Sequence, residues 1–292
     1  MEALTDFAGI GPKYSAYKTS KVVILPLPYD LTASYMKGAA GGPAAIIEAS
    51  PQLEWYDEEI DKEIYKSTGI CTLEPLGITR QKPEEMARTV EKKTLQLLDD
   101  NKFVVGIGGE HSVSVGIVAA YKKKFGDFSV LQLDAHSDLR ETYENSAYNH
   151  ACVMKRIIDM GIKAVQVGIR ATENDSYKEL VKQDRTKIFF AKDLWQNDRW
   201  IKDAVASLSR NVYITIDVDV FDPSIMPSTG TPEPGGMQWY PALALLREVA
   251  KQKNVIGFDV VELMPIKGIH FPEFSCARLI YKLIGYIFEN KV

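Results

Sequence analysis

The 292-residue chain contains few cysteines and no long apolar run. Its three cysteines, Cys71, Cys152 and Cys276, are far apart, and none belongs to a C-x-x-C pair. An odd, scattered set argues against a disulfide framework and against a zinc site built on thiolates. No segment reaches the roughly 18 unbroken apolar residues of a membrane span, and the first residues do not resemble a signal peptide. We therefore expect a protein of the reducing cytoplasm.

The sequence also lacks an excess of positive charge. Lysine and arginine total 35 against 39 aspartates and glutamates, which gives a net charge of −4. Nucleic-acid-binding domains usually carry clustered basic residues, whereas the run Lys122-Lys123-Lys124 has the position of a solvated helix end. With 46% hydrophobic and 25% charged residues, the composition is that of a globular protein and excludes disorder over most of the length. No nucleic-acid or membrane partner is indicated.

Short apolar runs alternate with longer amphipathic segments, a pattern typical of strands and helices that build a parallel sheet. We predict strands at 21–27, 103–107, 128–133, 164–169, 187–191, 212–216 and 255–261. We predict helices at 83–100, 112–125, near 149–160, and at 197–209, 239–252 and 272–290. The Gly- and Pro-rich stretches 38–43 and 223–236 are flanked by core patterns, so they are interpreted as functional loops and not as linkers. The whole chain, 1–292, is predicted to form one α/β domain.

Polar clusters follow three of the predicted strands at the point where each strand ends. The segment GGEHS carries His111 after strand 103–107, and DAHSD carries Asp134, His136 and Asp138 after strand 128–133. The segment DVD, with Asp217 and Asp219, follows strand 212–216. Ligands of open α/β sheets bind outside the carboxyl ends of the strands, so we expect these side chains to converge on one crevice.

Four aspartates in one crevice would repel each other unless cations offset a charge of about −4. Two divalent metal ions supply the matching charge, and oxygen-rich ligands with a minority of imidazole favour Mn²⁺ over a structural Zn²⁺. Each motif alone has a simpler interpretation: an isolated D-x-D is usually a solvated turn, and His111 alone could be a histidine at a helix N-terminus. Three strand ends that all carry such groups favour the metal site.

Four of these segments also resemble the signature segments of the ureohydrolase (arginase/agmatinase) family. They are GIGGEHSVS, LDAHSDLR, TIDVDVFDPS and FDVVELMP, which span roughly 100–265, and PYDLTASYMKGAAGGPAAI at 28–46 extends the resemblance. The resemblance implies a three-layer α/β/α domain with a mostly parallel central sheet and a centre of two Mn²⁺ ions per chain. One ion would be held by His111, Asp134, Asp138 and Asp217, and the other by Asp134, His136, Asp217 and Asp219. Asp134 and Asp217 would then bridge the ions.

The resemblance implies a hydrolase that releases urea from a guanidinium group. Two metal ions lower the pKa of a shared water, and Asp138 would guide its proton toward the leaving amine. Glu262 would bind the guanidinium, because paired carboxylate oxygens match paired N–H donors. His150 matches a family histidine that shuttles protons or touches substrate, although a histidine on a first helical turn is more often structural.

The substrate tail is predicted from two segments. Arginases carry an Asn/Ser-bearing loop where this chain has LRETYENSAYNH, with Arg140 in place of the Asn, and TGTPEPGGMQWYPAL (229–243) resembles agmatinases. Agmatine is therefore the favoured substrate, with urea and putrescine as products. Glu141, Glu144 and Glu233 would suit its distal ammonium group. Arg140 could instead receive the carboxylate of a guanidino acid such as guanidinobutyrate or guanidinopropionate; arginine and formiminoglutamate are further alternatives.

Two other classes of protein remain as alternatives. A catalytically inactive relative that binds or regulates polyamine enzymes would be expected to lose a metal ligand, whereas all six are present. A deacetylase-like amide hydrolase uses one zinc ion, for which two histidines and four aspartates are too many. The resemblance also implies a homo-oligomer, a trimer or hexamer. His270 matches no motif, and Met264 replaces a residue that is more often small or polar.

Overall fold

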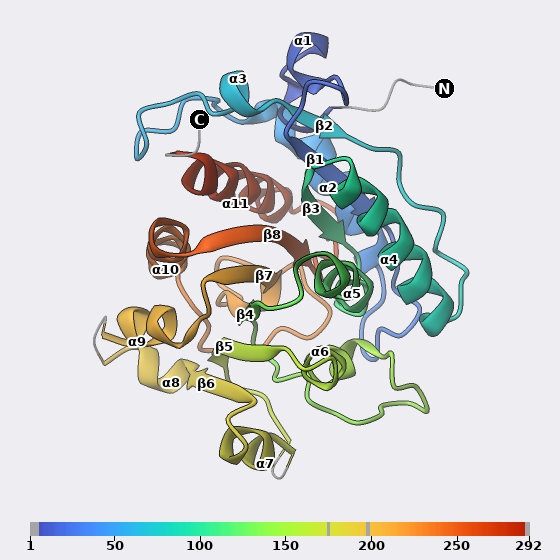
Figure 1. Ribbon diagram of the computed structural model, residues 1–292, viewed down its shortest axis with the longest axis vertical. Coiled ribbons are helices and arrows are strands. Elements are labelled where there is room, and N and C mark those ends of the chain that lie inside the picture. The colour runs from blue at the N-terminus through green and yellow to red at the C-terminus, as the bar shows by residue number, and fades with distance from the viewer. Residues whose placement is uncertain (1–5, 174–175, 197–198, 290–292) are drawn as a thin grey trace.

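A single eight-stranded parallel sheet forms the centre of the computed structural model, which describes residues 6–173, 176–196 and 199–289 (Figure 1). The strands are β1 (Val22–Leu27), β2 (Ile70–Thr72), β3 (Phe103–Gly108), β4 (Ser129–Leu133), β5 (Lys163–Ile169), β6 (Thr186–Phe190), β7 (Asn211–Asp217) and β8 (Asn254–Val261). Their order across the sheet is β2-β1-β3-β8-β7-β4-β5-β6. Every pairing of these strands is parallel.

Helices cover both faces of the sheet, as Figure 1 shows. One face is packed by α2 (Gly42–Ala49), α9 (Arg199–Ser207), α10 (Trp239–Gln252) and α11 (Phe271–Phe288). The other face is packed by α4 (Pro83–Asp99), α5 (Val113–Phe125) and α6 (Val153–Asp159). Shorter helices are α1 (Pro12–Ser15), α3 (Tyr65–Thr68), α7 (Ser176–Lys182) and α8 (Ala191–Leu194). This arrangement confirms the predicted three-layer α/β/α fold.

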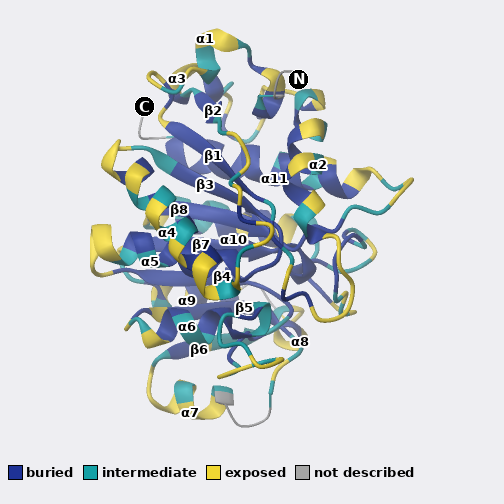
Figure 2. Cartoon of the chain, turned by 90° about the vertical axis from the view of Figure 1, so that its right-hand side faces the viewer, coloured by how far each residue is buried: buried dark blue, intermediate teal, exposed yellow. Residues whose placement is uncertain are grey.

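The strands contribute side chains to two hydrophobic cores, one on each face of the sheet. In β1, Val22 and Ile24 belong to the core under α11, whereas Val23 and Leu25 belong to the core under α4. Successive residues of a strand point to opposite faces, so a strand covered on both faces needs an uninterrupted apolar run. Figure 2 shows these strands buried, with exposed residues on the outer faces of the helices.

All seven predicted strands are confirmed, with ends that differ by at most one residue. The structure adds β2, which has three residues and so carries too short a pattern to be predicted. Ala191, predicted as the end of a strand, instead begins α8. The register explains this, because β6 pairs with β5 only as far as Phe190.

The predicted helices are also present in the described residues. The segment near 149–160 is a 3₁₀ turn, η4 (His150–Cys152), followed by α6. The predicted ends 197–198 and 290 lie outside the described residues, and α9 ends at Ser207 instead of 209. The stretch 38–43 is only partly a loop, because α2 begins at Gly42, where a Cβ atom would lie 2.3 Å from the Leu263 carbonyl oxygen. Lys122, Lys123 and Lys124 occupy the last turn of α5, as predicted.

No helix in the described part of the chain is long and apolar enough to cross a membrane.

Candidate metal centre and active site

The sheet order places the predicted site residues together. Strands β3, β8, β7 and β4 are consecutive neighbours at the centre of the sheet. His111 follows β3, Asp134 follows β4, Asp217 ends β7, Asp219 lies in the 3₁₀ turn η5 (Val218–Val220), and Glu262 follows β8. All these strands are parallel, so their carboxyl ends meet at one edge, as the sequence analysis expected.

His111 faces three carboxylates in a buried group. Its Nδ1 lies 3.1 Å from Asp134 Oδ2, 3.1 Å from Asp138 Oδ2 and 3.5 Å from Asp217 Oδ2. The side chain is 1% exposed, and Nδ1 has no hydrogen-bond partner of suitable geometry. A buried nitrogen without a partner is costly unless something else satisfies it.

The opposite nitrogen of His111 shows which atom carries the proton. Nε2 lies 2.8 Å from the Thr215 hydroxyl, which donates its hydrogen to Asp259 Oδ1 at 2.6 Å. Because the hydroxyl has one hydrogen, it must accept from Nε2–H, and Nδ1 is then the nitrogen that faces the carboxylates and could bind a cation. Tyr213 also donates to Asp259, at 2.6 Å. An imidazole nitrogen and carboxylate oxygens that converge in this way fit a divalent cation.

A second group lies around His136. Its Nδ1 is 2.8 Å from Asp219 Oδ2 and 3.7 Å from Asp134 Oδ1. Two sets of side chains thus bring their ligand atoms within 4.8 Å of one another: His111, Asp134 and Asp217, and Asp134, His136 and Asp219. Asp134 belongs to both sets, which is the arrangement required of a bridging ligand.

The charges at this edge of the sheet are poorly solvated. Burial and then the charge of Asp219 raise the pKa of Asp217 well above its usual value. Burial and the neighbouring Asp134 raise the pKa of Asp138 to about 6. Carboxylates that resist ionisation because of burial and mutual repulsion are stabilised in their charged form by a bound cation. The raised pKa values of Asp217 and Asp138 therefore fit a site that binds cations.

His150 and Glu262 meet beside this cluster. His150 Nδ1 lies 3.3 Å from Glu262 Oε1, and its Nε2 lies 3.0 Å from the Ser34 hydroxyl. Burial alone would lower the pKa of His150, but the hydrogen bond and charge of Glu262 outweigh it and raise the pKa to about 9. Glu262 Oε1 also accepts from the backbone N–H of His111 at 2.7 Å, which fixes the carboxylate.

A buried carboxylate that the sequence analysis did not single out holds this arrangement in place. Glu110 Oε2 accepts from the backbone N–H of Thr32 at 2.7 Å, and its Oε1 accepts from the Thr32 and Ser112 hydroxyls. The Thr32 hydroxyl oxygen in turn accepts from the backbone N–H of His150 at 3.2 Å, and Asn149 donates to the Thr32 carbonyl. Glu110 thereby fixes segment 30–36 against His150. Its place in GGEHS, directly before His111, was the available signal.

Some of the candidate site residues line a polar cavity. Its lining residues are Ser34, His136, Asp138, Arg140, Tyr143, His150, Ala151, Asp217, Asp219, Thr231 and Glu262. Arg140 forms an ion pair with Glu173, and its guanidinium carbon lies 4.8 Å from the centre of the Tyr143 ring. The charge of Arg140 is therefore offset by Glu173.

The carboxylates expected at the entrance are not among the lining residues. Glu141 forms ion pairs with Lys155 at 2.7 Å and Arg156 at 2.8 Å, and its side chain is 69% exposed. The charge of Glu141 is thus offset within the chain, and its role toward a distal ammonium stays a prediction. Glu144 and Glu233 do not line the cavity either. The backbone carbonyl of Glu233 instead accepts from Arg170, which also binds the carbonyl of Asp219 at 2.6 Å.

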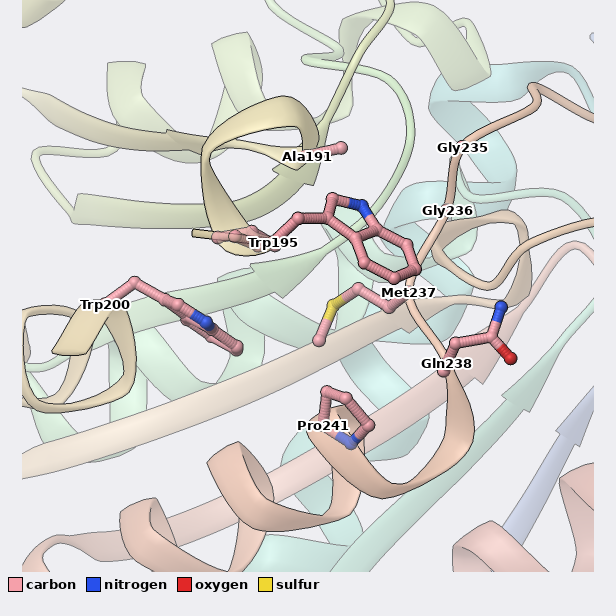
Figure 3. A pocket seen from close by; sticks show the side chains of 9 residues that line it. Ala191, Trp195, Trp200, Gly235, Gly236, Met237, Gln238 and Pro241 are labelled. Carbon is pink, nitrogen blue, oxygen red and sulfur yellow. The ribbon is translucent and has the colours of Figure 1, made fainter. Parts of the chain in front are cut away.

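A second cavity, shown in Figure 3, has a different character. Trp195, Trp200, Met237 and Pro241 surround it, and the described residues that line it include no ionisable side chain. Gly235 and Gly236 of segment 223–236 border this cavity, whereas Thr231 borders the polar one. The loop 223–236, which was predicted to be functional, therefore borders both cavities.

The two residues without an assigned role lie outside the polar cavity. Met264 is 5% exposed and packs close to Gly38, and its backbone N–H donates to the Ser228 carbonyl at 2.9 Å. His270 is exposed and precedes α11.

Comparison with known proteins agrees with this geometry. The model of the arginase family matches residues 20–285, so the chain belongs to the arginase family. The N(1)-aminopropylagmatine ureohydrolase of Synechocystis is 41% identical over 95% of this chain and 92% of its own length. The agmatinase of Pyrococcus horikoshii is 34% identical, over 92% of each chain. The chain is thus an amidinohydrolase, a ureohydrolase close to the agmatinase-like enzymes.

A solved structure shows the same fold. The agmatine ureohydrolase of Thermoplasma volcanium has a TM-score of 0.87 and 29% identity, over 99% of this chain and 96% of that one. The family resemblance stated from the four motifs is confirmed.

Proposed function

We propose that the chain hydrolyses the guanidinium group of a linear cationic amine, with two Mn²⁺ ions per chain, and releases urea and a primary amine. N(1)-Aminopropylagmatine is the favoured substrate and agmatine the second. The sequence motifs favoured agmatine, but the relative with 41% identity is named for its aminopropyl derivative. The observation that carries the proposal is His111 Nδ1, a buried nitrogen that faces three carboxylates beside Glu262.

Six residues would hold the ions. His111, Asp134, Asp138 and Asp217 would bind one ion, and Asp134, His136, Asp217 and Asp219 the other. Bound there, the ions would supply Lewis acidity that lowers the pKa of water and stabilises negative charge. Carboxylate-rich ligation with two imidazoles and no thiolate supports manganese.

Glu262 would bind and orient the substrate. Its Oε1 is fixed by the His111 backbone and lies beside His150, so the carboxylate is held before substrate arrives. A rigid carboxylate matches paired guanidinium N–H donors, and the cation is favoured in a cavity lined with aspartates. The guanidinium carbon would then lie above the cluster.

Asp138 and His150 would move protons. In the reaction, water forms a C–O bond to the guanidinium carbon, a C–N bond breaks, and the amine leaves with a proton. The carboxylate of Asp138 would accept the proton of the attacking water and deliver it to the leaving nitrogen. His150, hydrogen-bonded to Glu262, would exchange protons with solvent through the cavity.

The contacts of Arg140 favour a substrate with a cationic tail over a guanidino acid. A guanidino acid needs a free cation or amide donors for its carboxylate, but Arg140 is paired with Glu173 and stacked on Tyr143. A tail of methylene groups and ammonium groups makes no such demand. We also propose that the protein is cytoplasmic and forms a homo-oligomer, a trimer or hexamer.

The experiment is urea release from manganese-loaded protein that is offered five substrates side by side. They are N(1)-aminopropylagmatine, agmatine, guanidinobutyrate, guanidinopropionate and arginine. We expect the highest kcat/KM with N(1)-aminopropylagmatine, and urea and amine in equal amounts. A preference for a guanidino acid or for arginine would overturn the assignment of the tail, and no urea from any of the five would overturn the proposed activity.

A further inference from the structure

Two glutamines are buried within the sheet, beneath the candidate metal centre. Gln132 in β4 and Gln166 in β5 are partners in the parallel register, and both side chains are 0% exposed. Strands covered on both faces normally carry apolar residues, and a buried amide destabilises the fold unless its hydrogen bonds are made. Each glutamine therefore requires an explanation.

Hydrogen bonds connect the two amides to Asp134. Gln132 Nε2 donates to Asp134 Oδ2 at 2.6 Å, and its Oε1 accepts from Gln166 Nε2. Gln166 Nε2 also donates to the Ser137 carbonyl at 2.7 Å, and its Oε1 accepts from the Thr186 hydroxyl in β6 at 2.9 Å. The chain of bonds crosses three adjacent strands and ends on a carboxylate.

The charge of Asp134 determines which group donates and which accepts in each of these hydrogen bonds. An ionised carboxylate only accepts hydrogen bonds, so the Nε2 end of Gln132 must face Asp134. The Oε1 of Gln132 then requires a donor, which orients Gln166, and the Oε1 of Gln166 requires another, which the Thr186 hydroxyl supplies. No other assignment of the two amides satisfies all of these groups.

We propose that Gln132, Gln166 and Thr186 form a relay of positioning residues that fixes the orientation of Asp134. Asp134 Oδ1 accepts from the backbone N–H of His136 at 2.5 Å, and Oδ2 accepts from Gln132, so each oxygen is held by one bond. Asp134 is the residue shared by both candidate metal groups. The relay therefore acts on both ions through one carboxylate.

This inference rests on the proposed metal centre. Loss of the Gln132 donor removes one of the two hydrogen bonds that orient the Asp134 carboxylate. Substitution of a residue that orients a metal ligand typically changes metal affinity by about 10–100-fold. Gln132→Met keeps the length of the side chain and removes the donor. Thr186→Val keeps the shape and removes the outermost hydroxyl, which is separated from Asp134 by two glutamines.

A matched control is available for the threonine. Thr94 in α4 is also buried, and its hydroxyl has no hydrogen-bond partner among the described residues. Thr94→Val therefore makes the same chemical change in a buried place outside the relay. The unfolding temperature of the metal-free protein, measured for every variant, separates a loss of fold from a loss of affinity.

The test is manganese titration of the chelator-stripped full chain by calorimetry. We expect Gln132→Met to bind manganese about 10–100-fold more weakly. Thr186→Val should show a smaller loss and Thr94→Val none, and adding Thr186→Val to Gln132→Met should weaken binding no further, because residues of one chain of bonds are not additive.

Two outcomes overturn the relay and are distinguishable. If the unaltered chain binds manganese and releases urea, but Gln132→Met and Thr186→Val bind manganese as tightly, the relay is wrong and the proposed function stands. If the unaltered chain binds no divalent metal, the proposed function fails and the relay fails with it.

Discussion

His111 Nε2 lies 2.8 Å from the hydroxyl of Thr215, a residue that stands 104 positions later in the chain and two strands away in the sheet. The hydroxyl gives its hydrogen to Asp259, so it can only accept from the histidine. One threonine in a buried strand thereby determines that Nε2 carries a proton and that Nδ1 is the nitrogen turned toward the three carboxylates.

Replacing this threonine should weaken the site without changing its shape. In Thr215→Val, His111 loses the acceptor that fixes its tautomer, so we expect manganese affinity to fall about 10–100-fold. Manganese titration measures the change, with Thr94→Val as the control for a buried threonine. Equal affinities for Thr215→Val and the unaltered chain would contradict the role of the hydroxyl.

Glu262→Gln should impair substrate binding and catalysis but not metal binding. The amide oxygen can still accept from the His111 backbone, but the charge that pairs with guanidinium is lost. Hydrogen bonds to charged groups contribute about 1.5–3 kcal/mol, so kcat/KM should fall by roughly 10–150-fold. Steady-state kinetics give the ratio, and metal analysis of the same preparation provides the control. A variant with full activity would show that the guanidinium binds elsewhere.

Substitutions of Arg140 and of Glu173 should affect the range of substrates differently. Arg140→Ala should leave turnover of agmatine and its aminopropyl derivative largely intact, because the arginine has no role toward a cationic tail. Glu173→Gln removes the charge that neutralises Arg140, so turnover of guanidinobutyrate should rise relative to agmatine. Parallel measurements of kcat/KM for both substrates test the pair. A collapse of agmatine turnover in Arg140→Ala would contradict the account.

A cluster of Glu59, Tyr286 and Lys282, outside the candidate site, should make the stability of the fold depend on pH. Burial alone would raise the pKa of Glu59, but hydrogen bonds from Tyr286 at 2.8 Å and Lys282 at 3.1 Å outweigh it and lower the pKa. A lowered pKa stabilises the fold above the ordinary glutamate value of 4.5 and loses that contribution as pH falls through the folded-state pKa. Glu59→Gln should therefore lower the unfolding temperature at pH 7, and the difference should shrink in acid.

The control for this prediction is Glu54→Gln, a change at an exposed glutamate of the same segment. Its unfolding temperature should follow that of the unaltered chain at every pH. A Glu59→Gln difference that stays constant down to pH 3 would show that the ionised carboxylate does not carry the effect.

Much of the fold was predictable because its strands are covered on both faces. Runs such as FSVLQL and VYITI have few polar residues, so their positions follow from the sequence within one residue. The three-residue β2 was not predictable, since a strand that short has no pattern of its own. Helix α2 was partly interpreted as a loop because it begins with Gly42 and Pro43 at a close contact with Leu263.

The candidate site was predictable where its residues follow strands directly. The residues that position them were not, because Thr215 and Gln132 look like ordinary members of a strand until the register shows what lies beside them. The polar Gln132 inside an apolar run was the available signal. The ion pairs of Glu141 were not predictable, because the sequence does not show that Lys155 and Arg156 lie next to it.

The most direct test of the account is the number of manganese ions bound per chain at saturation. Two candidate groups that share Asp134 predict two ions per chain, with both lost or greatly weakened in Asp134→Ala. Equilibrium dialysis followed by metal analysis gives the count. Two ions in the unaltered chain would support the two-metal centre, whereas one ion or none would contradict it.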